Sequence, residues 1–172
     1  MLDLLGGRSS ALTDLPPTDD DWYLNLLWID RQKCILLTHA GTLFTVFRAG
    51  VRSADLRPIG SYLVTAIQTE LRAEHLPTDT FSQLQPDNVR LAKTASPSTL
   101  GFMNEMAFEL RYRIADTGGL HRCDIDSLNH QLRRTLRNRG EYVRPIDLVA
   151  QRLQERPSPA TTPPPVAHTP HP

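Results

Sequence analysis

Three short apolar segments follow one another near the start of the chain, at residues 22–29, 34–38 and 42–47. Only a few residues separate them, at 30–33 and at Ala40-Gly41. Parallel strands need a crossover of a dozen or more residues, whereas connections this short can join antiparallel neighbours. The spacing therefore predicts a three-stranded antiparallel meander.

Beyond residue 57 the apolar residues recur at helical rather than strand spacing. A first helix is predicted from Pro58 to about His75, and a second from 97 to about 115, with Ser96 as its N-cap and Pro97 at its first position. Between these two helices a fourth strand is expected at 88–93. The remaining predicted elements are a helix from 124 to about 138 that Gly140 stops, and a short helix that opens at Pro145.

These elements predict an α+β fold, in which a small, mostly antiparallel sheet, the meander plus one further strand, packs against three or four helices. Residues 22–156 form the predicted domain, and residues 1–21 form a polar N-terminal segment. Residues 157–172 contain seven prolines in sixteen positions. Since that composition cannot bury a core, we expect a disordered tail.

The 172 residues carry no net charge, but the charges are unevenly distributed. Residues 1–30 hold six aspartates and one arginine, a net charge of −5, whereas residues 121–156 hold eight arginines and five acids, a net charge of +3. The two ends could attract each other within the fold, or the basic end could meet an anionic partner.

Two cysteines are too few for a disulfide framework, and no apolar run is long enough to cross a bilayer. The N-terminus does not resemble a signal peptide. We therefore expect a cytoplasmic protein that does not interact with membranes.

Three blocks in order resemble one bacterial family: WYLNLLWIDRQKCILLTHAGTLF at 22–44, KTASPSTLGFMNEMAF at 93–108, and the segment 124–145. The chain resembles the domain-of-unknown-function 6933 family over about residues 22–153. That resemblance implies no established activity, cofactor or catalytic residue. Relatives usually begin with a further short strand, and they carry arginine at position 97 and aspartate at position 105, where this chain has Pro97 and Glu105.

The first candidate site is the start of the second helix, where free N–H groups meet hydroxyls and a lysine. Such a junction could bind an anion or a nucleotide phosphate, although helix capping alone would also explain the hydroxyls. It lacks the glycine-rich loop of a P-loop. The candidate residues are Lys93, Thr94, Ser96, Ser98, Asn104 and Glu105.

The second candidate is a basic helix whose arginines could follow a phosphate backbone, namely Arg133, Arg134, Arg137 and Arg139. Cations are also expected at a helix C-terminus, because they oppose the helix dipole. The neutral overall charge argues against nonspecific nucleic-acid binding.

Neither His121-x-Cys123 nor the pair Cys34 and His39 has the spacing of a zinc site, so no metal and no cofactor are expected. Glu105 and Glu109 lie one helical turn apart and could act as acid and base, but ion pairs with nearby arginines explain them as well.

The leading hypothesis is a non-catalytic binding or interaction module, whose partner is unidentified and could be an anion, a nucleic acid or a protein. One alternative is an enzyme acting on a phosphorylated small molecule or a nucleic acid through Lys93, Asn104 and Glu105. The other is an adaptor that a partner recognises through the proline-rich tail.

Overall fold

The computed structural model describes residues 16–81, 84–92 and 96–156. Within them lie four α-helices, two short 3-10 helices and five strands, as the α+β prediction requires. In chain order the elements are β1 (Trp22–Ile29), β2 (Gln32–His39), β3 (Thr45–Arg48), α1 (Ile59–Ala73), η3 (Pro86–Asn88), α2 (Pro97–Asp116), η4 (Leu120–Arg122), α3 (Ile125–Arg134), β4 (Arg137–Asn138), β5 (Tyr142–Val143) and α4 (Pro145–Glu155).

The predicted meander is confirmed as a three-stranded antiparallel sheet in the order β1-β2-β3. In its register Trp22 lies opposite His39, and Thr38 opposite Thr45. From Cys34 onward every residue of β2 is buried. Because β2 is the central strand and is covered on both faces, its sequence is continuously apolar from Cys34 to Leu37 rather than alternating.

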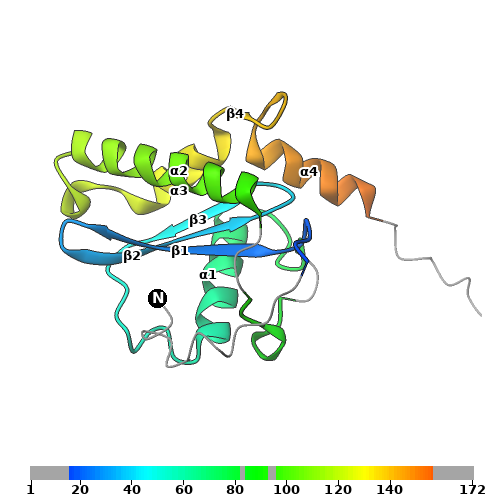
Figure 1. Ribbon diagram of the computed structural model, residues 1–172, viewed down its shortest axis with the longest axis horizontal. Helices are drawn as coiled ribbons and strands as arrows, with labels where there is room; N and C mark the ends of the chain where they lie inside the picture. Colours follow the sequence, from blue (N-terminus) through cyan, green and yellow to red (C-terminus); the bar gives the residue numbers. More distant parts are fainter. Residues whose placement is uncertain (1–15, 82–83, 93–95, 157–172) are drawn as a thin grey trace, which may run out of the picture.

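Helices cover both faces of the sheet, with α2 and α3 on one side and α1 on the other (Figure 1). Alternation along the strands therefore divides the core in two. One cluster joins Leu27, Leu36 and Phe47 to α2 and α3. The other joins residues such as Leu37 and Val46 to α1 and to Val149 of α4.

The outer edge of β3 is closed by side chains of α3 rather than by another strand. Asn129 accepts a hydrogen bond from the Phe47 N–H at 2.8 Å and donates one to the Phe47 carbonyl at 3.0 Å. One turn later, Arg133 donates to the Thr45 carbonyl at 3.0 Å. Buried backbone groups need partners, and these two side chains act for β3 as a neighbouring strand would.

The expected fourth strand is not a strand in the described residues 88–92. Pro86–Asn88 forms a 3-10 turn instead, and only Ala92 makes an isolated β-bridge. The turn packs closely on α1, because a Cβ at Gly60 would overlap the Pro86 carbonyl oxygen. Tertiary packing has thus overridden the strand-like alternation.

The helix predicted from 124 to about 138 is also shorter than expected and ends at Arg134. Its N-cap is Asp124, whose carboxylate accepts from the backbone N–H groups of Asp126 and Ser127. The chain then turns into the hairpin of β4 and β5. Gly140, at φ 89°, belongs to that hairpin turn and not to a helix end.

The acidic N-terminal end and the basic C-terminal end meet within the fold. Arg152 pairs with Asp20 at 2.5 Å, and Arg139 lies 3.6 Å from Asp19. The attraction within the chain that the charge distribution suggested is therefore present, although exposed pairs of this kind contribute little stability.

We expect Asn129→Ala to lower the free energy of unfolding by about 2 kcal/mol, because it leaves a buried N–H and C=O of Phe47 without partners. Urea denaturation would measure the change. Ser127→Ala, at an exposed position on the same helix, is the matched control and should shift stability far less. Equal losses in the two variants would contradict the role given to Asn129.

Candidate functional site

The start of α2 is built as a capped helix. The Ser96 hydroxyl oxygen accepts from the Thr99 N–H at 3.3 Å and from the Thr99 hydroxyl at 3.0 Å, and it lies 3.0 Å from the Ser98 hydroxyl. Pro97 occupies the first helical position. The hydroxyls of Ser96 and Ser98, which the anion-site hypothesis invoked, are therefore already engaged in the helix cap. Lys93 and Thr94, the other residues of that hypothesis at this junction, lie outside the described residues.

Asn104 and Glu105 do not join Ser96 in a described pocket. Both are exposed on the side of α2 that faces away from the sheet. They share that side with three large apolar residues, Phe108, Tyr112 and Leu100, which are 73%, 69% and 41% exposed. We call this set the α2 outer face: Leu100, Asn104, Glu105, Phe108 and Tyr112.

Helical geometry explains the composition of the α2 outer face. Residues 100, 104, 108 and 112 are spaced by four, so their side chains form one stripe. The buried residues Met103, Met106, Leu110 and Ile114 lie on the opposite side of the helix. The helix is thus apolar on two sides, of which only one is covered by the core.

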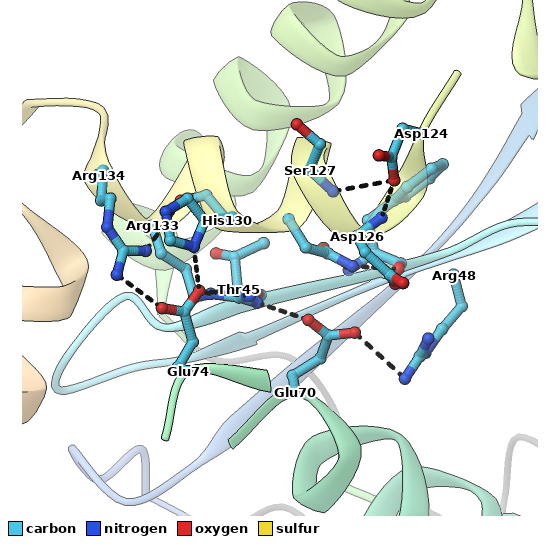
Figure 2. A network of polar contacts seen from close by, with 12 residues as sticks. Thr45, Arg48, Glu70, Glu74, Asp124, Asp126, Ser127, His130, Arg133 and Arg134 are labelled. Carbon is cyan, nitrogen blue, oxygen red and sulfur yellow. Dashed lines mark hydrogen bonds and ion pairs between the residues drawn. The ribbon is translucent and has the colours of Figure 1, made fainter. Parts of the chain in front are cut away.

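The predicted basic helix is dominated by a buried ion-pair network centred on Arg133, whose side chain is 1% exposed (Figure 2). Its guanidinium group lies 2.9 Å from Glu70 and 2.7 Å from Glu74, both on the α1 side of the sheet. It also stacks over the Phe44 ring, with its central carbon 4.9 Å from the ring centroid. Arg133 therefore joins α3, β3 and the end of α1.

Two further arginines and a histidine surround the two carboxylates (Figure 2). Arg48 lies 3.2 Å from Glu70, while Arg134 and His130 lie 2.7 and 3.2 Å from Glu74. Burial alone would raise the pKa of Glu74, but hydrogen bonds and charges from Arg134 and Arg133 outweigh it, and the pKa is lowered. The carboxylate is thus held in its ionised form.

Arg137 is held in a second network with residues of α2. Its side chain is 4% exposed and lies 2.5 Å from Glu109, which also accepts from Arg113 at 2.7 Å. Burial would raise the pKa of Glu109, but the hydrogen bonds and charges of Arg137 and Arg113 lower it. Glu109 is therefore committed to ion pairs.

The four arginines of the nucleic-acid hypothesis do not form one exposed stripe. Arg133 and Arg137 are buried, and Arg134 is 40% exposed beside Glu74. Arg139 lies beyond the end of α3 and donates to the Gly41 carbonyl. The helix was expected to continue to residue 138, and its earlier end places these side chains in different surroundings.

His39 is the buried residue whose proton affinity is most strongly altered. Its Nδ1 atom accepts from the Thr42 N–H at 3.2 Å, and its ring packs between Trp22 and Phe81, at centroid distances of 5.2 and 4.4 Å. Burial, with a smaller contribution from the charge of Arg152, lowers the pKa of His39 to about 4. The imidazole is therefore neutral and structural at neutral pH.

A shallow groove of about 420 Å³ lies between the hairpin and α4. It contains none of the residues that the sequence suggested for a site, and Glu141, Arg144 and Asp147 provide its charges. Its lining residues are Leu136, Glu141, Tyr142, Val143, Arg144, Asp147, Leu148 and Gln151.

Neither cysteine is placed for thiol chemistry. Cys34 is buried and Cys123 half-buried, and burial raises the pKa of both thiols. In the part of the chain that the structure describes, no cluster of three or more His, Cys, Asp or Glu side chains is arranged to hold a metal ion. The helices described there also include none that is long and apolar enough to cross a membrane.

Comparison with protein families gives a match over residues 1–148 to the family described as Domain of unknown function (DUF6933). The chain belongs to this family. The match extends the resemblance to the first residue, whereas the sequence blocks supported it only from about residue 22. Searches of curated proteins and of solved structures gave no significant match.

The sequence analysis did not identify the carboxylates that pair with the arginines of α3 inside the fold. Glu70 and Glu74 are four residues apart near the end of α1, on a helix whose other buried positions are apolar or glycine. Two carboxylates one turn apart on such a helix were a usable signal for buried cations. Asn129, by contrast, gave no signal, since its partner is backbone of a strand 82 residues earlier.

We expect Arg133→Ala to lower the free energy of unfolding by about 3–5 kcal/mol, because it leaves Glu70 and Glu74 buried with too little positive charge. Arg134→Ala, at a more exposed position, should cost about 1 kcal/mol or less. Urea denaturation of both variants provides the comparison. Similar midpoints for Arg133→Ala and the wild type would contradict the network.

Stability should also depend on pH through His39. The unfolded histidine takes up a proton as pH falls below 6.5, whereas the folded one does so only near pH 4. The free energy of unfolding should therefore decrease through this window, by on the order of 3 kcal/mol. Protonation of Glu74 and Glu109, whose folded pKa values are lowered, should reduce stability further at still lower pH.

Urea denaturation at a series of pH values would test this. His39→Gln should flatten the slope between pH 6.5 and 4, whereas His121→Gln, at an exposed position, should keep it. A slope that survives in His39→Gln would assign the pH dependence to other groups.

Proposed function

We propose that this member of the DUF6933 family is a non-catalytic protein-interaction module that binds its partner through the α2 outer face. The observation that carries the proposal is the exposure of Phe108 and Tyr112, at 73% and 69%, on the side of α2 opposite its buried residues. Contiguous exposed apolar side chains rimmed by polar ones are typical of interaction surfaces.

The chemistry of the α2 outer face suits a protein partner. Aromatic side chains are the residues on which binding energy concentrates at interfaces, because each buries a large area in few conformations. Asn104 and Glu105 would supply polar contacts beside the aromatic rings. The expected partner therefore presents an apolar groove that receives one face of a helix.

The surroundings of the ionisable residues support a non-catalytic role. Acid–base catalysis needs a titratable group within reach of a substrate. Glu70, Glu74 and Glu109 instead face arginines, and His39 is enclosed by aromatic rings. Glu105, the carboxylate of the enzyme alternative, is exposed on the α2 outer face.

Three of the earlier alternatives gain no support from a particular contact. Recognition through the proline-rich tail concerns residues 157–172, which lie outside the described part of the chain. Anion binding beside Ser96 stays a prediction that also involves Lys93 and Thr94. A nucleic-acid surface would have to use Arg134 and Arg139, with Arg133 and Arg137 buried.

Replacing both aromatic residues, as Phe108→Ser with Tyr112→Ser, should remove the partner that co-purifies with the tagged wild-type protein from its native cells. The bound amount should fall at least about tenfold, because the apolar contact area is lost. The free energy of unfolding should stay within about 0.5 kcal/mol of the wild type, since both side chains are exposed.

Tyr142→Ser is the matched control, because Tyr142 is 75% exposed but lies on the hairpin. The control should retain the partner. If the double variant retains it as well, or if Glu105→Gln alone abolishes a measurable catalytic activity, the proposed function is wrong.

A further inference from the structure

The groove between the β4-β5 hairpin and α4, here called the hairpin groove, lies outside the α2 outer face. Tyr142 and Val143 of the hairpin line one side of it, and Leu148 and Gln151 of α4 line the other. All of its lining residues belong to one stretch of chain, 136–151, in which the hairpin leads directly into α4 (Figure 1). Its shape is therefore set by two adjacent elements that are both described.

The hairpin groove combines exposed apolar side chains with a hydrogen-bond donor. Leu136 and Tyr142 are 54% and 75% exposed, and Leu148, which lines the groove with them, is half-buried. Arg144 has five N–H donors, and its Nη1 atom lies 4.0 Å from Asp147, beyond hydrogen-bond range. Arg144 can therefore donate to a ligand. Aromatic-lined grooves are typical docking sites for segments in the polyproline II conformation.

The chain that continues from α4 has the composition of such a ligand. Residues 157–172 contain seven prolines, three of them consecutive at 163–165, and no Asp, Glu, Lys or Arg. Proline favours polyproline II, in which the backbone carbonyls have no internal hydrogen bonds and can accept one from a donor such as Arg144. A proline run is also stiff before it binds, so docking costs little conformational entropy.

The distance between the proline run and the hairpin groove is short enough for the two to meet within one chain. Leu148 lies eight residues before Arg156, which is about 12 Å along the helix axis. The six residues 157–162 can span up to about 19 Å in polyproline II. Arg156 is itself held 3.2 Å from Asp79, so the segment starts from a fixed point at the end of α4.

The tether also determines which occupant suits a groove this shallow. A linker of a few residues gives the attached segment an effective concentration on the order of millimolar. A groove with only millimolar affinity is then substantially occupied by a segment of its own chain, whereas a separate protein at lower concentration leaves it largely empty. The covalent connection thus favours residues of this chain over an external proline-rich ligand.

We propose that residues 163–166, Pro-Pro-Pro-Val, bind in the hairpin groove of the same chain in the polyproline II conformation. The proline rings pack on Tyr142 and Leu136, and Arg144 donates to a carbonyl of the run. This contact is independent of the proposed function, because it uses no residue of the α2 outer face.

The test is a comparison of backbone amide NMR spectra of the full chain. Replacing Pro163, Pro164 and Pro165 together by glycine removes the stiff run. The amide signals of the groove, those of Val143, Leu148 and Gln151, should then move away from their wild-type positions. Replacing the two prolines beyond the run, as Pro170→Gly with Pro172→Gly, is the matched control and should leave these signals in place.

A synthetic peptide of residues 157–172 supplies the reverse experiment. Added to the full-chain variant that carries the three glycines, it should restore the wild-type amide positions, with a dissociation constant on the order of millimolar. Tyr142→Ser in that variant should abolish the restoration. Phe108→Ser with Tyr112→Ser should leave it unchanged, which separates this contact from the one proposed for the α2 outer face.

Three results would each overturn the proposal. The first is a set of groove amide signals that the three glycine substitutions leave unchanged. The second is a set of signals that moves with protein concentration, since the run would then occupy the groove of another copy. The third is movement on Leu4→Ser with Leu5→Ser but not on the glycine substitutions, which would assign the groove to residues 1–15.

Discussion

The contact between Arg133 and two carboxylates, Glu70 of α1 and Glu74 at its C-cap, holds the layers of this protein together. One guanidinium group reaches Glu70 and Glu74 of the helix region on one face, the Thr45 carbonyl of the sheet, and the ring of Phe44. A buried ion pair adds little stability over an apolar replacement of the same shape. Removing only one of its partners is very destabilising, because the other charge is then buried without compensation. The interaction therefore specifies how α1, β3 and α3 are placed relative to one another.

The sequence was most informative where periodicity acts locally. The meander, the capped start of α2 and the α+β class follow from alternating strands, short turns and the Ser96-Pro97 pair, and the structure confirms them. The strand expected at 88–93 was wrong, because alternation over a few residues cannot show that η3 will pack against Gly60. The end of α3 was misplaced for a similar reason, since Leu136 continues the helical spacing of Leu128 and Leu132 past Arg134.

The candidate residues were harder to judge than the elements that carry them. An arginine near a helix C-terminus has the same sequence signature whether it faces water or a carboxylate from a distant helix. Arg133 pairs with residues about sixty positions away, which a single sequence does not disclose. The exposed positions of Asn104 and Glu105 followed from their helical phase, but the aromatic residues beside them were not singled out.

Asn129 and Arg133 have a further consequence for how the protein can assemble. They satisfy the Phe47 N–H and the carbonyls of Phe47 and Thr45, so these groups of the β3 edge cannot pair with a further strand. A sheet with two open edges can add copies without limit, which is the geometry of fibres. An edge whose backbone groups are already hydrogen-bonded cannot take part in such growth. Two polar side chains on α3 thus protect the β3 edge of the sheet against pairing with another chain.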